Sequence, residues 1–330
     1  MGTIPQRSSY CQCLEGRSQG HLSLPTIVGT RERLGQWLAL FRAGNSLTGI
    51  FGVVLGAMLA TQGIPKGDYG QITALHAFSV MTFMFSWNAL NDVMDIEIDA
   101  INRPDRPLPS GQITLGSAKL GVYATGLLSL FSLVGAGLIA ASGDMGLENW
   151  IHALAIWLIA LLLLVNYETS KYPFLGLKDR GLPGNMAISL AVGLVILFGA
   201  AGVSKPFDNR AISVFIIGFL YNLSREIVKD IEDMDGDKGR QTMAMTSGAE
   251  RARMIAWLIL LATLASLLLP FAPILGVFED WQVIFVIPAV ISLLLVKTKL
   301  FASEDHAAQM LIKRSMQLGL ASFFLISLLS

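Results

Sequence analysis

Nine long apolar runs, separated by short polar connectors, are the feature that most restricts how this chain folds. A helix that crosses the hydrocarbon core of a bilayer needs about 20 apolar residues, and 17–25 is the usual range. Backbone polar groups in hydrocarbon must be paired within their own segment, so each run is predicted to be a helix. The runs are 34–62, 71–98, 114–141, 150–167, 183–202, 210–231, 253–275, 281–297 and 313–330. We therefore predict an all-α polytopic membrane bundle of about nine transmembrane helices, with a kink at Pro288.

The composition excludes several other classes of protein. Of the 330 residues, 53% are hydrophobic and 15% are charged, whereas a soluble domain carries about 25% charged residues. This disfavours a soluble enzyme and excludes a disordered chain. Lys and Arg balance Asp and Glu at 24 each, so net charge indicates no partner. We find no nucleic-acid patch, no nucleophilic triad and no sign of a protein partner, and Cys11 and Cys13 form no disulfide framework.

The chain divides into two parts by polarity. Residues 1–33 are polar and rich in Gly and Ser, and are predicted to form a mobile N-terminal extension. Residues 34–330 contain all nine apolar runs and are predicted to form one domain.

Basic residues gather in alternate connectors, and this asymmetry predicts the topology. The connectors after the first, third, fifth and seventh runs hold only Lys66, Lys205 and Arg210. The connectors after the even-numbered runs hold Arg103, Arg106, Lys171, Lys178, Arg180, Lys229, Lys238, Arg240, Arg251, Arg253, Lys297, Lys299, Lys313 and Arg314. The positive-inside rule places the second group in the cytoplasm. We therefore expect the N-terminus inside and the C-terminus outside.

Two acidic stretches with the same spacing follow the second and sixth apolar runs. Both read DxxDxxxD, and their members are Asp92, Asp95 and Asp99, and Asp230, Asp233 and Asp237. Positions i, i+3 and i+7 share one face of a helix, so each stretch is predicted to present a column of carboxylates. Asn88 and Asn91 extend the first column. Both columns are expected on the same side of the membrane.

Stacked carboxylates repel one another, and a divalent cation removes that repulsion. Mg²⁺ binds one or two carboxylates and keeps its other positions for water and phosphate oxygens, so two facing columns would hold Mg²⁺ and a diphosphate. Arg103, Arg106, Arg225 and Lys229 lie among the acids and would bind the same anion. Two alternatives remain open: solvated helix ends without function, and the site of a cation-coupled transporter, whose carboxylates usually lie near the bilayer midplane.

A diphosphate held beside an apolar chamber suggests a reaction. Metal and basic groups would stabilise the leaving diphosphate. If the carbon that it leaves is allylic, a carbocation forms that must be protected from water. A bundle open to lipid provides that protection and admits an isoprenoid tail from the bilayer.

At these residues the chain resembles the UbiA-type intramembrane prenyltransferases. The stretch NALNDVMDIEIDAINRPDRPLPSG (88–111) is similar to the first Asp-rich motif of that superfamily, and REIVKDIEDMDGDKGRQT (225–242) is similar to the second. The resemblance spans residues 34–330 and implies a nine-helix, Mg²⁺-dependent enzyme of the lipid bilayer that uses a prenyl diphosphate.

The resemblance also implies residue roles. Tyr167 and Lys171 match a Tyr-x-x-x-Lys element in which the lysine contacts diphosphate and the tyrosine steadies the carbocation, although Lys178 is an alternative ligand. Arg42 and Asn45 match an Arg-x-x-Asn pattern of the cavity wall. The candidate catalytic residues are Tyr167, Lys171, Asp95 and Asp237; the substrate-binding residues are Arg42, Asn45, Asn88, Arg103, Arg106, Lys178, Asn185, Arg225 and Lys229; and the metal ligands are Asn91, Asp92, Asp95, Asp99, Asp230, Asp233 and Asp237.

The acceptor is less constrained than the chemistry. INRPDRP (101–107), GLPGN (181–185) and REIVKDIED (225–233) look most like archaeal enzymes that transfer geranylgeranyl to geranylgeranylglyceryl phosphate in ether-lipid synthesis. Chlorophyll synthases share much of the first motif, and homogentisate or quinone prenyltransferases share the end of the second. An aromatic or chlorin acceptor therefore remains the alternative to the lipid acceptor.

Overall fold

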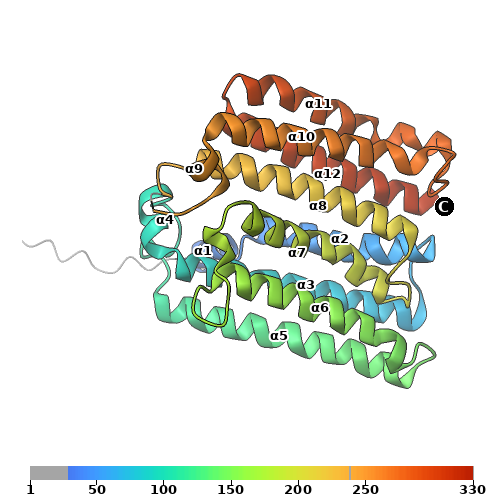
Figure 1. Ribbon diagram of the computed structural model, residues 1–330. Helices are drawn as coiled ribbons and strands as arrows, with labels where there is room; N and C mark the ends of the chain where they lie inside the picture. Colours follow the sequence, from blue (N-terminus) through green and yellow to red (C-terminus); the bar gives the residue numbers. More distant parts are fainter. Residues whose placement is uncertain (1–28, 238, 330) are drawn as a thin grey trace, which may run out of the picture.

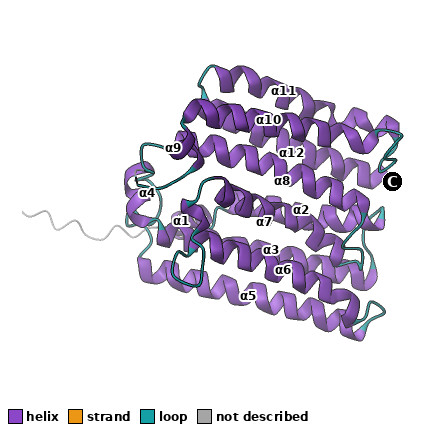
Figure 2. Ribbon diagram, viewed as in Figure 1, coloured by secondary structure: helices purple, strands orange, loops and turns teal. Residues whose placement is uncertain are grey.

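The computed structural model describes residues 29–237 and 239–329, and every regular element in those residues is helical (Figures 1 and 2). The α-helices are α1 (Thr30–Leu40), α2 (Ala43–Thr61), α3 (Gly67–Met94), α4 (Ile96–Asn102), α5 (Leu115–Ser142), α6 (Leu147–Glu168), α7 (Leu182–Ala201), α8 (Asn209–Glu232), α9 (Met243–Ser247), α10 (Ala249–Leu268), α11 (Ile287–Phe301) and α12 (Asp305–Leu329). Three 3₁₀ turns complete the set: η1 (Leu177–Asp179), η2 (Leu269–Phe271) and η3 (Asp280–Val286). The predicted all-α class is confirmed.

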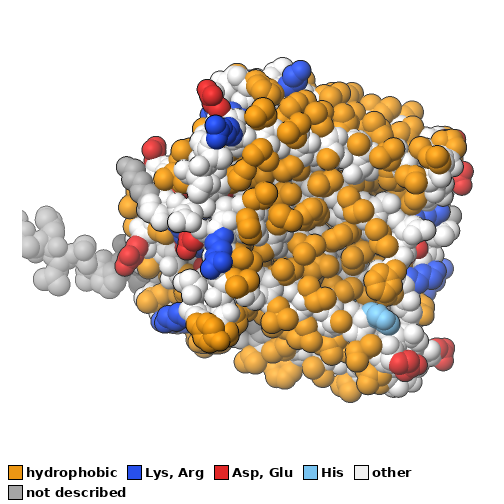
Figure 3. Space-filling view, viewed as in Figure 1, with side chains coloured by type: hydrophobic (Ala, Val, Ile, Leu, Met, Phe, Trp, Pro, Cys, Tyr) orange, Lys and Arg blue, Asp and Glu red, His pale blue; other side chains and the backbone are white. Residues whose placement is uncertain are grey.

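The long helices run side by side, and eight of those described are long and apolar enough to cross a membrane (Figure 1). A wide band of hydrophobic side chains covers the visible face, with charged side chains at the two ends (Figure 3). The protein is therefore an integral, multi-pass membrane protein. α3 is a ninth long helix that is not among the eight, so the count of nine spans stays a prediction.

The polar side chains of α3 find partners on neighbouring helices. The hydroxyls of Ser79 and Ser129 lie 3.0 Å apart, and the Ser132 hydroxyl donates to the Leu75 carbonyl over 2.8 Å. The buried His76 accepts a hydrogen bond from the Trp150 indole over 3.1 Å. Small hydroxyl residues of this kind let membrane helices approach closely and hydrogen-bond across the interface. α3 can therefore be more polar than the other long helices and still lie within the bundle.

The first apolar run does not form one helix. α1 ends at Leu40 and α2 begins at Ala43, because Arg42 adopts a left-handed backbone conformation with φ 47°. The break lets the Arg42 guanidinium reach Asp92 on α3. α1 itself begins at Thr30, inside the predicted extension, and residues 1–28 of that extension lie outside the described residues.

The last two runs also differ in detail from the expectation. Pro288 lies in the first turn of α11, where η3 gives way to an α-helix, so the predicted kink coincides with a change of helix type. The last helix begins at Asp305, eight residues before the apolar run, because its first turns are amphipathic rather than wholly apolar.

The two Asp motifs lie at the ends of α3 and α8, but neither forms a straight column. α3 stops before Asp95, which joins it to α4, and α8 stops before Asp233, which is followed by turns. The expectation of three carboxylates on one helix face is therefore wrong for both motifs. The α3 motif bends at Asp95, so Asp92 and Asp99 share Arg106 whereas Asp95 contacts Lys178 and Arg240.

α2 and α7 approach each other through glycines. A Cβ built on Gly56 would lie 1.9 Å from the Ile196 carbonyl oxygen, and one on Gly199 would lie 2.0 Å from that of Val53. Both contacts are with backbone, which cannot move aside cheaply.

Gly56→Ala is therefore expected to destabilise the protein by about 2–3 kcal/mol, as overpacking a tight interior does. Thermal melting in detergent measures the effect. Gly44→Ala is the matched control, since it lies on the same helix and its Cβ would meet nothing within 4 Å. Equal melting temperatures for the two variants would contradict this account of the helix crossing.

Candidate active site

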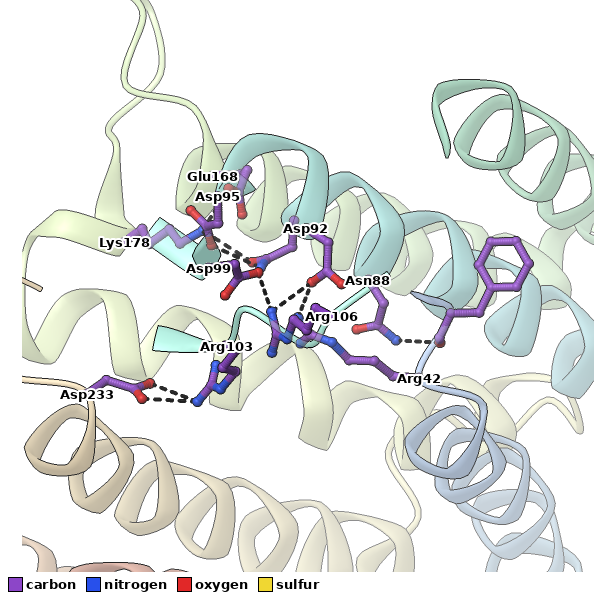
Figure 4. Close-up of polar contacts among 12 residues, drawn as sticks. Arg42, Asn88, Asp92, Asp95, Asp99, Arg103, Arg106, Glu168, Lys178 and Asp233 are labelled. Atoms are coloured by element: carbon purple, nitrogen blue, oxygen red, sulfur yellow. Dashed lines mark hydrogen bonds and ion pairs between the residues drawn. The ribbon is translucent and has the colours of Figure 1, made fainter. Parts of the chain in front are cut away.

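The first Asp motif is held by arginines (Figure 4). Asp92 is 2% exposed and accepts hydrogen bonds from Arg42 and, over 3.1 Å, from Arg106. Arg106 also donates to Asp99 on α4. Arg106 thus bridges the two sides of the α3–α4 bend, which explains why the helix breaks at Asp95.

Asp95 is the centre of a second group of contacts. Its carboxylate lies 2.6 Å from the Lys178 ammonium and 3.0 Å from the Arg240 guanidinium, and it accepts a hydrogen bond from the Asn91 amide over 3.0 Å. Lys178 also contacts Glu168 at the end of α6, at 2.8 Å. Figure 4 shows Lys178 pointing between Asp95 and Glu168. The end of α3 is thereby tied to the η1 segment and to the turns after α8.

The second Asp motif faces the first through shared cations. Arg240 joins Asp95 to Asp237, whose carboxylate lies 3.1 Å from it. Arg103, from the loop that follows α4, contacts Asp233 at 3.0 Å. Burial raises the pKa of Asp237, and the neighbouring Arg240 opposes that shift. The two motifs, about 140 residues apart in the chain, therefore form one polar assembly.

Asp230, the first Asp of the second motif, lies in the last turn of α8 and contacts α7. It accepts a hydrogen bond over 2.9 Å from Asn185 on α7, a residue that is 7% exposed. Sequence reasoning placed both residues in the site, and the structure brings them together.

A cavity of about 480 Å³ opens beside this assembly. Among the described residues, its polar end is lined by cationic side chains and one carboxylate, Glu226. The cations are Arg42, Arg103, Arg106, Arg225, Lys229 and Lys313. Its other end is apolar and contains aromatic side chains such as Phe83, Trp87 and Trp157. A polar anion and a long hydrocarbon tail can therefore lie in one continuous space.

A smaller cavity of about 410 Å³ adjoins Asp95 on its outer side. Lys178 and Arg240 line it, together with their ion-pair partners Glu168 and Asp179. Glu168 Oε2 is buried and has no hydrogen-bond partner among the described residues. This carboxylate therefore has an unused acceptor next to the Asp95 group.

Most of the predicted residues meet in this region. Asn45, Asn88 and Tyr167 line the large cavity, and the Tyr167 ring centre lies 6.0 Å from the Lys178 ammonium. Lys171 is the exception, because its side chain is exposed in the loop after α6 and makes no hydrogen bond or ion pair with a described side chain. Of the two candidate lysines, the structure brings Lys178 to the Asp motifs.

Sequence reasoning missed several members of the site. They are Glu168, Asp179, Glu226 and Lys313. Glu168 and Glu226 are acids at the ends of apolar helices, which is the same signal that identified the Asp motifs. Asp179 and Lys313 carry no such signal, because only the packing of distant segments brings them to the site.

The donor chemistry of the Asp motifs fits Mg²⁺. Carboxylate and amide oxygens are the ligands that this ion takes, and Glu168 adds an oxygen with no partner. Within residues 29–237 and 239–329, however, no three acidic, His or Cys side chains are grouped to hold a metal. Instead of a metal ion, each Asp carboxylate of the two motifs contacts an arginine, a lysine or an asparagine. Metal binding would require these partners to release the carboxylates, and the assigned ligand set stays a prediction.

Comparison with known proteins gives a consistent result. The UbiA prenyltransferase family matches residues 49–324. Two curated relatives named digeranylgeranylglyceryl phosphate synthase come from Methanothermobacter thermautotrophicus and Methanopyrus kandleri. The first is 31% identical over 88% of this chain and 94% of its own length, and the second is 34% identical over 87% and 97%.

Solved structures share the fold. A structure described for digeranylgeranylglyceryl phosphate synthase has a TM-score of 0.63 and 28% identity, and covers 91% of this chain and all of its own. A UbiA homologue from Archaeoglobus fulgidus bound to GPP and Mg²⁺ has a TM-score of 0.57 at 18% identity, over 88% and 99%. The matched family segment contains both Asp motifs and nearly all of the cavity. This chain belongs to the UbiA prenyltransferase family and is an intramembrane prenyltransferase.

Proposed function

We propose that the protein transfers a geranylgeranyl group from its diphosphate to the hydroxyl of geranylgeranylglyceryl phosphate, in the presence of Mg²⁺. The observation that carries this proposal is the single cavity with a strongly cationic end beside both Asp motifs and an apolar end beyond them. The curated relatives carry the name of this synthase. A diphosphate, an allylic chain and an ether-forming alcohol all suit that space.

The polar end would bind the diphosphate. Asn91, Asp95 and Asp99 would hold Mg²⁺ on one side and Asp233 and Asp237 on the other. Asp92 and Asp230 lie next to these ligands. When bound, the metal would neutralise charge on the leaving diphosphate. Arg103 and Arg106 line the cavity and contact the Asp motifs, so they can donate charge-assisted hydrogen bonds to the same anion.

The apolar end would hold the prenyl chain and exclude water. Trp87 and Trp157 line the cavity, and Tyr167 lines it near the polar end, with its ring centre 6.0 Å from the Lys178 ammonium. Aromatic faces stabilise cations at distances up to about 6 Å. Loss of diphosphate leaves an allylic cation, which the acceptor hydroxyl attacks to form the ether bond. A base takes the hydroxyl proton in the same step, and the released diphosphate is the second product. Keeping water out of this chamber prevents hydrolysis of the cation.

The cationic end favours a phosphorylated acceptor. Of the six basic side chains that line the cavity, Arg225, Lys229 and Lys313 form no ion pair with the Asp motifs among the described residues, so they are available to a second anion. An aromatic or chlorin acceptor brings no matching phosphate. Prenylation of an aromatic acceptor remains the second candidate, because the same apolar end accommodates a flat ring.

We also propose that the end of the bundle with the Asp motifs faces the cytoplasm. α1 and α4 lie at that end, and α12 finishes at the opposite end, as an odd number of crossings requires (Figure 1). The proposed orientation follows from the basic connectors. In a chain without its native cysteines, Asp105→Cys should react with an impermeant maleimide only after the cytoplasmic side is opened, and labelling of intact cells would contradict the orientation.

We expect substitutions of Lys178 and Lys171 to have different effects on catalysis. Lys178→Gln is expected to lower kcat/KM for geranylgeranyl diphosphate roughly 10- to 150-fold, because a hydrogen bond to a charged group is worth about 1.5–3 kcal/mol. Lys171→Gln, in the same segment but exposed, is the matched control and is expected to stay within about twofold of wild type. Initial-rate kinetics measure both. A larger loss for Lys171→Gln than for Lys178→Gln would reverse the assignment.

The acceptor is tested by offering several acceptors in separate reactions. Labelled geranylgeranyl diphosphate is incubated in liposomes with geranylgeranylglyceryl phosphate or with a panel of aromatic acceptors. Label in a doubly alkylated glyceryl phosphate is the expected result. Label only in an aromatic product would keep prenyl transfer and overturn the lipid acceptor.

A further inference from the structure

The six cations of the large cavity fall into two groups by their partners. Arg42, Arg103 and Arg106 contact Asp92, Asp233 and Asp99, so this group is balanced by acids of the two motifs. The second group is Arg225, Lys229 and Lys313. Among the described residues its only ion pairs are with Glu226, which lies 2.9 Å from Arg225 and 3.5 Å from Lys229. This second group therefore carries an excess of about two positive charges.

The side chains of the second group come from different helices and line the same cavity. Arg225 and Lys229 lie one turn apart on α8, and Lys313 lies on α12, which packs against both α8 and α2. Lys313 donates to the side-chain oxygen of Asn45 on α2 over 3.4 Å. Side chains from three helices thus converge on one part of the cavity mouth.

One polar atom in this group has no partner. The Nε of Arg225 is buried and makes no hydrogen bond within the described residues. A buried, unpaired guanidinium N–H costs about 1–3 kcal/mol or more unless something accepts from it. Gln309 and Gln317, one turn before and after Lys313 on α12, add amide donors to the same lining. The group therefore lacks an acceptor-rich anion.

We propose that Arg225 and Lys313, with Asn45 beside them, bind the phosphate of the acceptor lipid, apart from the diphosphate bound at the Asp motifs. A phosphate monoester carries about −1.5 to −2 charges at pH 7, which matches the excess charge of this group. The inference rests on the proposed function, because only a phosphorylated acceptor supplies this anion. Glu226 then keeps Arg225 and Lys229 oriented toward the cavity.

The test compares Lys313→Gln with Arg314→Gln. Arg314 is the next residue on α12, is exposed and makes no side-chain hydrogen bond or ion pair among the described residues, which makes it a matched control. Lys313→Gln is expected to raise KM for geranylgeranylglyceryl phosphate at least tenfold. KM for geranylgeranyl diphosphate should stay within about twofold. Transfer to the unphosphorylated alcohol geranylgeranylglycerol should be unchanged, and Lys313→Arg should restore most of the affinity.

The outcomes separate this inference from the function on which it rests. Wild-type protein that transfers to geranylgeranylglyceryl phosphate, with an unchanged acceptor KM in Lys313→Gln, would overturn the phosphate subsite alone. A rise in KM for the diphosphate instead would assign Lys313 to the donor and also overturn it. Wild-type protein that never uses the phosphorylated acceptor would overturn the function itself. A fall in melting temperature in Lys313→Gln but not in Lys313→Arg, without an acceptor KM change, would show a structural role only.

Discussion

Replacing Asp95 or Asp237 with asparagine is expected to lower kcat at least about a thousandfold while the protein still folds and inserts into the membrane. Each substitution keeps the size of the side chain and removes its charge. Asp95 contacts Lys178 and Arg240, and Asp237 shares Arg240 with it, so both acids organise the region proposed to bind metal and diphosphate. Loss of one preorganised electrostatic group costs about 10²- to 10³-fold in rate, and loss of a metal ligand adds to that.

The fold should survive these changes because the basic partners keep other contacts. Lys178 still contacts Glu168, and Arg240 still contacts Asp179. Glu97→Gln and Asp235→Asn are the matched controls, since both acids lie within the two motifs, are exposed and make no side-chain hydrogen bond or ion pair among the described residues. Steady-state turnover and thermal melting of all four variants give the comparison. Wild-type-like turnover in both Asp95→Asn and Asp237→Asn would contradict the assignment of these two residues as catalytic.

The second large effect is expected at Gly218 on α8. It lines the cavity, and a Cβ built there would meet nothing within 4 Å, so a larger side chain has space to enter the cavity. Gly218→Leu should displace about three methylene groups of a long prenyl chain, at about 0.8 kcal/mol each. The preference in kcat/KM for geranylgeranyl over geranyl diphosphate is then expected to fall roughly 50- to 100-fold.

Competition between the two diphosphates measures this preference directly. Gly116→Leu is the control, because its Cβ would also meet nothing but it lies on α5 outside the cavity lining. An unchanged preference in Gly218→Leu would place the prenyl chain elsewhere. Equal loss with both donors would indicate damage to the site rather than a change in chain-length selection.

The membrane helices were largely predictable from the sequence, because hydrophobic length fixes where a span lies. The run 210–231 became α8 (Asn209–Glu232), and 183–202 became α7 (Leu182–Ala201). The breaks were not predictable. Arg42, Asp95 and Asp233 interrupt or end helices, at points where their side chains meet charges from other segments. The pattern of apolar residues does not predict such contacts between charged side chains.

The sequence predicted which residues form the site better than it predicted how they contact one another. Repeated DxxDxxxD spacing identified the acids, because identical spacing at two helix ends is visible in the chain. The pairing of Asp95 with Arg240, 145 residues away, depends on how α8 and its following turns pack. The same packing selects Lys178 over Lys171 and adds Lys313, which no local pattern distinguishes from other surface lysines.

The most direct test of the central claim is a transfer assay in liposomes with labelled geranylgeranyl diphosphate and geranylgeranylglyceryl phosphate. The account predicts label in a doubly alkylated glyceryl phosphate. That product should be lost when EDTA removes divalent metal and restored when Mg²⁺ is added back. Folded wild-type protein that forms no such product with Mg²⁺, or forms it equally in EDTA, would contradict the account.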